Sequence, residues 1–543
     1  MTSRRPSASA PPAPLSRARR RLVLLILCVS LFMAMLDNTV VNTALPTVER
    51  RLGAGISDLQ WIVDGYSLSL AALMLTASTV GDMFGRRRAF LAGLALFTAG
   101  SALCALSTGV PALIAGRVVQ GAGAAAFLPG TLSVIRQVYT DERERGTAIG
   151  IWAGVSGLGL GLGPLIGGPL VDHFGWPSVF WINVPVGVAG LAVGRLIPES
   201  WDRRGRGLDL PGQLLGVLGL GGVVYATIEG PVRGWSDGTV RWTYVGAAVL
   251  LALFLLVESR TRAPMLDLAF FRDRIFAGAV LSGLVLYLGM FSVLYFLSLW
   301  LQSVLGWSPT GAGLVIMPAM VVVAAVTPLA GWLTGRIGGG VPMALGLACS
   351  AGALYGLTGY GADASYRHFW WLLPLIGLGM GLTITPITAT VMARVPAARA
   401  GMASAVSNTA RELGGVLGVA VLGSVLTSRM ASSLRDRLAA QGVPAAERDR
   451  LVAAAAGGTG HPQPGTGGSA AVQSAVNAAF VDGLHLAELT GCVVLVAGAV
   501  VSLLLVRGGR DHSRRSPAAA TVPGPGRGTT GRTSGADRTG RSR

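Results

Sequence analysis

The feature that most constrains this chain is a long succession of apolar runs. About fourteen of them, each roughly the 20 residues that one helix needs to cross a bilayer, follow one another between residues 22 and 506. The run from Ala148 to Val171, for example, contains no charged residue. Backbone polar groups inside a bilayer must be paired within the protein, and a helix pairs them within one segment. We therefore predict an all-α, multi-pass membrane protein.

The composition agrees with a membrane location. Hydrophobic residues make up 51% of the 543 residues, charged residues only 13%, and the mean hydropathy is +0.58. A soluble chain could not bury so much apolar surface. The net charge of +18 does not indicate a nucleic-acid partner, because residues 1–21 and 507–543 carry +6 and +7 of it. The four cysteines are dispersed without metal-ligand spacing, so we predict no metal site.

The arginines between the runs predict the orientation. Arg-rich loops, such as 85–88 and 199–207, alternate with short loops that are nearly uncharged, and cytoplasmic loops carry the excess of positive charge. We therefore place both termini in the cytoplasm. The absence of lysine is typical of a high-GC bacterial genome, so the expected location is a bacterial inner membrane. The predicted spans lie near 22–44, 58–80, 89–107, 111–136, 146–170, 178–198, 208–230, 240–258, 275–300, 309–333, 341–360, 369–393, 401–427 and 485–506.

An internal repeat divides the spans into two related halves. Residues 78–87, STVGDMFGRR, align with 331–338, GWLTGRIG, at an offset of 253, so that Gly85 corresponds to Gly338. Such repeats are typical of transporters. The predicted order is a disordered tail at 1–21, a six-helix bundle at 22–198, an inserted helix pair at 199–258, a second six-helix bundle at 259–506 with a loosely ordered external loop at 428–484, and a disordered tail at 507–543.

Three charged residues lie inside apolar runs. Asp37 in LDNTVVNTALP and Asp64 in WIVDGYSL are candidate proton carriers, because intramembrane acids are costly and usually functional. Arg117 in LIAGRVVQGAGAA needs a counter-ion, and Asp37 is the natural candidate. The alternatives are that Asp37 caps or packs a helix and that Asp64 reaches interfacial water.

Residues 150–168, GIWAGVSGLGLGLGPLIGG, form an unusually glycine-rich span. Small residues let membrane helices approach closely, and Pro164 adds a kink. We expect Gly159 and Gly163 to bring this helix against a neighbour across the interface between the two bundles. The alternative is a packing helix without a special role.

These stretches resemble the fourteen-span drug:proton antiporter branch of the major facilitator superfamily. The resemblance rests on LDxTVVNxALP, on the Arg117 stretch, on GDMFGRRR at 81–88, and on a fifth-helix motif made by Gly150, Gly159, Gly163, Pro164 and Gly167. It implies the major facilitator fold, with two six-helix bundles and an inserted pair, and it associates Arg117 with proton coupling.

The resemblance also implies which residues control the conformational switch. They are Asp82, Gly85, Arg86 and Arg87, together with the fifth-helix motif. Ser78 and Met83 depart from the family pattern, which has a glycine and an arginine at those positions. A contact made by that arginine in the family is therefore not expected here.

A candidate substrate surface lies in the ninth span. Tyr287, Phe291 and Tyr295 recur every four residues and so share one helical face, which would suit a flat lipophilic molecule. Glu229, at the end of the seventh span, is a further candidate. Aromatic stripes also serve in packing and in interfacial belts, and Glu229 would equally suit a structural ion pair.

No catalytic constellation or nucleotide-binding loop is present in the sequence, so we predict neither an enzyme nor a cofactor. The predicted function is proton-coupled export of lipophilic drugs or antibiotics by a monomer, with protons and membrane lipids as the other partners. Two alternatives stay open. One is a facilitator-fold exporter or symporter of another metabolite; the other is a membrane receptor or scaffold, which would need a docking domain.

Overall fold

The computed structural model describes residues 16–200, 209–261, 266–395, 400–457 and 470–506, and the regular elements in these ranges are all helices. In chain order they are α1 (Arg17–Leu52), α2 (Ile56–Phe84), α3 (Arg86–Ala105), α4 (Val110–Val138), α5 (Glu142–Phe174), α6 (Ser178–Trp181), α7 (Asn183–Gly194), α8 (Leu210–Arg233), α9 (Gly238–Arg260), η1 (Leu268–Arg272), α10 (Arg274–Leu299), η2 (Trp300–Val304), α11 (Pro309–Ile337), α12 (Gly340–Leu357), α13 (Tyr366–Phe369), α14 (Leu372–Ala393), α15 (Ala400–Ala440), α16 (Ala445–Gly457) and α17 (Ala470–Leu505).

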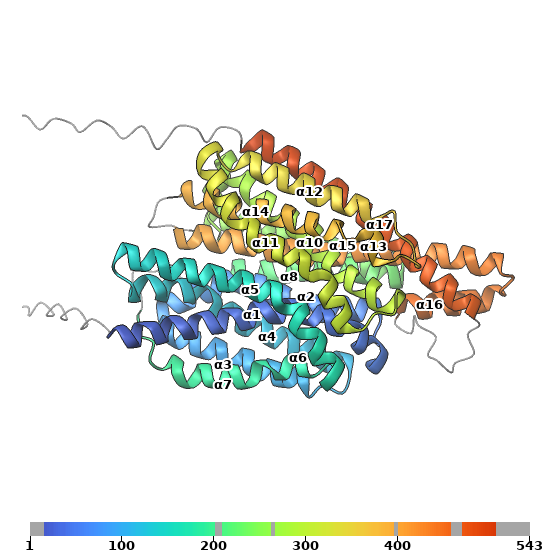
Figure 1. Cartoon of the computed structure of the whole chain (residues 1–543), viewed down its shortest axis with the longest axis horizontal. Coiled ribbons are helices and arrows are strands. Elements are labelled where there is room, and N and C mark those ends of the chain that lie inside the picture. The colour runs from blue at the N-terminus through green and yellow to red at the C-terminus, as the bar shows by residue number, and fades with distance from the viewer. Residues whose placement is uncertain (1–15, 201–208, 262–265, 396–399, 458–469, 507–543) are drawn as a thin grey trace, which may run out of the picture.

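The helices form two groups that lie side by side, α1–α7 and α10–α17 (Figure 1). We call them the N bundle and the C bundle. Helix α8 packs on both groups, through α2 and α15, and α9 packs on α8. The start of α1 and the end of α17 lie at one end of the molecule, which we call the tail end (Figure 1). Helix α16 lies at the opposite end, the cap end (Figure 1).

The helices suit a bilayer in length and apolarity. Eleven helices in the described ranges are long and apolar enough to cross one, and α5 makes a twelfth if its two halves, bent by 44°, form one span. The predicted spans 58–80 and 178–198 correspond to α2 and to the α6–α7 pair, which are not among these. Fourteen membrane crossings therefore stay a prediction.

Span six is one apolar helix from Ser178 to Gly194 with a weak point between α6 and α7. Pro185 has no N–H, so the hydrogen bond that would run back to the carbonyl of Trp181 is missing. Ile182, between the two helices, keeps helical backbone angles of φ −58° and ψ −30°. Phe180 and Asn183 are three residues apart and therefore lie on one helical face.

The segment 428–484 differs from its prediction on both sides of residues 458–469, which lie outside the described residues. Instead of a loosely ordered loop, α15 continues to Ala440, α16 follows, and α17 begins at Ala470. Arg437 and Asp482 join the extensions of α15 and α17 through a 2.8 Å ion pair. The predicted tails 1–21 and 507–543 lie mostly outside the described residues, but Arg17–Arg21 is helical rather than disordered.

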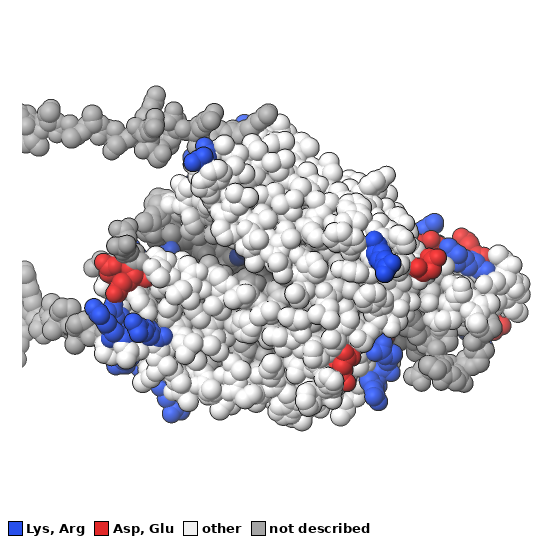
Figure 2. All heavy atoms as spheres, viewed as in Figure 1, with Lys and Arg blue, Asp and Glu red and all other residues white. Residues whose placement is uncertain are grey.

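The surface is divided into charged ends and an apolar middle. In Figure 2 the acidic and basic side chains gather at the tail end and the cap end, with a broad uncharged band between them. A bilayer would surround such a band. The loops at the two ends therefore meet water, as the sequence predicts.

The N and C bundles are joined at the cap end. Ser298 Oγ donates to the carbonyl of Asn42 at 2.8 Å, and Gln60 Nε2 donates to the carbonyl of Val419 at 3.1 Å. The backbone N–H of Thr310 donates to Asp172 Oδ2 at 3.1 Å. Toward the tail end the surface is hollowed between the two bundles (Figure 2). The molecule is closed at the cap end and open at the tail end.

Candidate functional site

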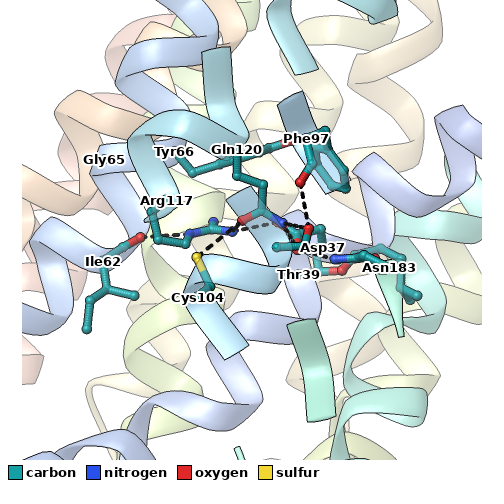
Figure 3. Close-up of polar contacts among 12 residues, drawn as sticks. Asp37, Thr39, Ile62, Gly65, Tyr66, Phe97, Cys104, Arg117, Gln120 and Asn183 are labelled. Atoms are coloured by element: carbon teal, nitrogen blue, oxygen red, sulfur yellow. Dashed lines mark hydrogen bonds and ion pairs between the residues drawn. The ribbon is translucent and has the colours of Figure 1, made fainter. Parts of the chain in front are cut away.

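A completely buried ion pair joins α1 to α4. Asp37 on α1 is 0% exposed and Arg117 on α4 is 1% exposed, and Arg117 Nη1 lies 2.6 Å from Asp37 Oδ2 (Figure 3). The predicted contact between these residues is therefore present. Removing two charges from water is expensive, and the attraction between them compensates only when further hydrogen bonds saturate both groups.

Two amides complete the contacts of Asp37. Gln120 Nε2 donates to Oδ1 at 2.7 Å, and Asn183 Nδ2 donates to the same oxygen at 2.8 Å. In Figure 3 Asn183 approaches Asp37 from the side opposite to Arg117. A carboxylate only accepts hydrogen bonds, so the amide nitrogens must be the atoms that face it. Neither amide is among the predicted site residues, although Gln120 is three residues after Arg117 and thus on the same helical face.

Arg117 has further partners around its guanidinium. Its Nε donates to the carbonyl of Ile62 at 3.0 Å, and the guanidinium lies 4.4 Å from the ring centroid of Tyr66 and 5.8 Å from that of Phe180. Cations are attracted to aromatic faces, more so away from water. Arg117 is thus held by α1, α2 and α6 at once.

Asp64 does not join this network. It is 0% exposed on α2, and neither of its carboxylate oxygens has a hydrogen-bond partner in the described structure. A buried ionised carboxylate without partners is costly. Asp64 therefore stays a second candidate proton carrier, separate from the Asp37–Arg117 pair.

The predicted gate residues lie at the tail end, where Gly85 separates α2 from α3. Gly85 has φ +116°, which favours glycine, and a Cβ there would lie 2.6 Å from Glu199 Oε1. Glu199 accepts from the Arg87 N–H at 3.1 Å and pairs with the Arg87 and Arg88 side chains at 3.5 and 3.7 Å. The Arg86 N–H donates to the carbonyl of Ser200.

The sequence analysis did not single out Glu199 as a partner of this loop. The side chain of Asp82 lies outside the described ones.

The glycines of α5 face two different neighbours. A Cβ at Gly159 would lie 2.7 Å from Met35 Cβ, a Cβ at Gly163 would collide with Thr39 Oγ1, and one at Gly167 would lie 2.7 Å from Val40 Cγ2. All three neighbours belong to α1 of the same bundle. The prediction that Gly159 and Gly163 face the other bundle is therefore wrong.

The contact across the interface uses other residues of the same stretch. A Cβ at Gly168 would lie 2.5 Å from Thr310 Cα on α11, and one at Gly313 of α11 would collide with the carbonyl of Pro164. Gly150 has open space around it. Helical periodicity predicts that one face of the helix carries small side chains, but only the tertiary structure decides which neighbouring helix that face contacts.

The candidate substrate residues do not form one surface. Tyr287 lies under the Arg411 guanidinium at 5.6 Å, whereas Tyr295 is 0% exposed and packs on Phe296 with ring centroids 4.8 Å apart. Glu229 forms a 2.9 Å ion pair with Arg233 on α8. The side chain of Phe291 lies outside the described ones.

A small cavity lies instead between the two bundles. It is lined mainly by apolar atoms and by a few polar groups from α1, α5, α10 and α11, among them Thr39, Asn42, Pro164, Ser298, Ile316 and Met320. Its volume of about 20 Å³ is far below the roughly 300–1,000 Å³ of a usual small-molecule site, so in this conformation it marks a place between the bundles and not a complete substrate site.

Comparison with known proteins agrees with this architecture. A family model, the Major Facilitator Superfamily, matches residues 27–419. The multidrug resistance protein Stp of Mycobacterium tuberculosis (strain CDC 1551 / Oshkosh) is 36% identical over 524 residues, which cover 92% of this chain and 96% of that protein. The tetracenomycin C resistance and export protein of Streptomyces glaucescens is 34% identical, covering 94% and 96%.

A solved structure shares the fold. It is a bacterial homologue of the human lysosomal transporter Spinster in an inward-facing, unoccupied conformation, with a TM-score of 0.59 and 18% sequence identity. The match covers 91% of this chain and 98% of that one.

Proposed function

This chain belongs to the major facilitator superfamily, and we propose that it uses protons to export lipophilic drugs or antibiotics across a bacterial inner membrane. Its similarity to resistance and export proteins over nearly the whole chain supports drug efflux. The observation that carries the proton coupling is the completely buried pair of Asp37 and Arg117. A proton on Asp37 would remove the charge that holds Arg117 in place.

In the proposed cycle the two bundles rock about the cavity between them. The Arg-rich tail end faces the cytoplasm, so the closed cap end faces outward and the described conformation receives substrate from inside. Substrate binds between the bundles, where the small cavity lined by α1, α5, α10 and α11 would have to widen to hold it. Entry of one proton releases about 2.3 kcal/mol per 100 mV of membrane potential, and about 1.4 kcal/mol per pH unit. We propose a monomer as the working unit, surrounded by lipid.

The remaining sequence candidates take supporting roles in this cycle. Asp64 would serve as a second proton carrier near the cap end. Gly85, Arg86 and Arg87, together with Gly168 of α5, which packs on Thr310 of α11, would set the switch between conformations. Asp82 belongs to the same proposed gate. Tyr287 is the member of the aromatic stripe with a cationic neighbour, Arg411. It is the stripe residue that we retain as a candidate substrate contact.

The test of coupling is Asp37→Asn, which keeps the size of the side chain but cannot carry the proton. In everted vesicles we expect this variant to insert normally and to lose drug-dependent proton movement and proton-driven drug accumulation. Glu229→Gln, which alters an acid in the α8 ion pair, is the matched control and should retain both activities. Normal drug-dependent proton movement by Asp37→Asn would refute the assignment.

A further inference from the structure

Span six contacts both members of the ion pair, a relationship that the proposed coupling leaves unused. Phe180 of α6 lies 5.8 Å from the Arg117 guanidinium, and Asn183, the first residue of α7, donates to Asp37 Oδ1 at 2.8 Å. Asn183 is 1% exposed. Phe180 and Asn183 are three residues apart on one helical face, so the same face brings one side chain to each charge.

On the basis of the proposed proton coupling, we propose that Asn183 is a positioning residue that sets how tightly Asp37 holds its proton, and that its amide reverses when the proton arrives. The ionised carboxylate accepts at Oδ2 from Arg117, and at Oδ1 from Gln120 and Asn183. These donors stabilise the charged form. A protonated Asp37 carries an O–H, which needs an acceptor in place of a donor.

The two amides differ in their freedom to supply that acceptor. Gln120 is anchored at both ends, because its Oε1 accepts from Arg117 Nη1 at 2.8 Å and its Nε2 also donates to Ser101 Oγ at 2.9 Å. In the described structure the Asn183 amide is held by its bond to Asp37 alone. A half-turn about its Cβ–Cγ bond exchanges Nδ2 for Oδ1 and lets Asn183 accept the proton of the Asp37 O–H.

The backbone that carries Asn183 is fixed, so the amide and not the helix must turn. Helix α7 packs against α3 through glycines. A Cβ at Gly187 would collide with Thr98 Oγ1, one at Gly190 would lie 2.8 Å from Leu94 Cδ2, and one at Gly194 would lie 2.9 Å from Leu91 Cδ2. Asn183 is thus held at a constant distance from Asp37 while its amide stays able to rotate.

The experiment measures how drug-dependent proton movement in everted vesicles depends on cytoplasmic pH. Asn183→Leu removes the donor and replaces the amide by a somewhat larger apolar group, so the charged form of Asp37 loses one hydrogen bond. We expect the midpoint of the pH profile to move upward by about one to two pH units, since a hydrogen bond to a charged group has that strength. The sign follows because a proton held more tightly is released only at higher pH.

Two further variants make the test decisive. Asn183→Ala also lacks the donor and demands no extra space, so it must shift the midpoint in the same direction even if the leucine variant fails to fold. Asn38→Leu removes a buried amide beside Asp37 whose Oδ1 has no partner in the described structure, and should leave the midpoint in place.

Each outcome has one meaning. An unshifted midpoint in either folded Asn183 variant would overturn the role of Asn183 while leaving the coupling by Asp37 intact. An equal shift in Asn38→Leu would overturn it as well, because the effect would then not depend on the contact. Failure of the coupling itself shows separately, as normal transport by Asp37→Asn.

Discussion

Helices α4 and α14 occupy related places in the two bundles and have opposite chemistry. Gly121 and Gly123 of α4 allow close contact with α2 and α3, and Gly377 and Gly379 of α14 allow the same contacts with α11 and α12. Counting back from these glycines, Arg117 and Gln120 correspond to Leu373 and Ile376, which are both 0% exposed. One bundle holds an ion-pair network where the other holds aliphatic side chains.

The difference shows that the fold does not need the charges. The C bundle is built with the same glycine contacts and an apolar residue at the position of Arg117. Buried ion pairs are often replaceable by apolar groups without loss of stability, so a retained pair calls for another reason. We infer that the N bundle carries the proton chemistry, and that the C bundle supplies an apolar wall for the substrate.

The largest expected effect comes from replacing Arg117 of α4 by leucine, the residue type at the corresponding position of α14. Arg117→Leu leaves Asp37 buried without its cation, so we expect the free energy of unfolding to fall by about 3–5 kcal/mol and transport to be lost. Adding Asp37→Val should restore most of the stability but none of the transport. Unfolding in detergent and vesicle transport measure the two effects. If the Arg117→Leu protein without the second substitution were as stable as the wild type, the inference drawn from comparing α4 with α14 would be wrong.

A second prediction separates the glycines within a bundle from those between bundles. The pattern within bundles occurs twice: Gly163 of α5 meets α1, and Gly418 of α15 meets α10. Gly163→Leu should therefore overpack the N bundle and lower its stability by about 1–3 kcal/mol, in both conformations alike. Gly168→Leu should act on the contact with α11 and disfavour the closed cap end.

The measurement is the labelling of a cysteine placed at Met320, in a chain whose four native cysteines are replaced. Gly168→Leu should change its accessibility from the two sides of the membrane by roughly five- to a hundredfold, the factor that corresponds to 1–3 kcal/mol. Gly163→Leu should leave the accessibility ratio unchanged. Gly150→Leu is the control, since no atom lies within 4 Å of its added Cβ. Equal accessibility in all three variants would reduce these glycines to spacers.

The sequence predicts a contact when the two residue types themselves require it, and fails to predict one that depends on tertiary packing alone. The pairing of Asp37 with Arg117 follows from the cost of two opposite charges in apolar runs. Asn183 and Glu199 could not be found in this way, because each reaches its partner only through the packing of segments that are far apart in the sequence. Helix α16 could have been predicted, since AAERDRLVAAAAG is rich in residues that favour helices.

The smallest expected effect concerns the two related loops at the tail end. Gly85 and Gly338 both have positive φ, at +116° and +83°, but only Gly85 lies against a carboxylate, whereas a Cβ at Gly338 would meet open space. Glu199→Gln keeps the acceptor for the Arg87 N–H and removes the charge. Because the Arg87 and Arg88 side chains are 35% and 75% exposed, we expect a loss of less than about 1 kcal/mol in stability.

The dependence on salt tests the cause of this small effect. Screening weakens exposed ion pairs, so the stability difference between Glu199→Gln and the wild type should shrink between 0.01 and 1 M salt, over which the Debye length falls from about 30 Å to about 3 Å. Glu229→Gln, which removes the ion pair to Arg233 within α8, should lose a similar amount, because that pair is partly exposed too. If the charge serves only to fasten the start of α3, transport by Glu199→Gln should stay within a few-fold of wild type. A fall as deep as that of Asp37→Asn would instead place Glu199 in the switch itself, and would give the N bundle a second charged element that the loop at Gly338 lacks.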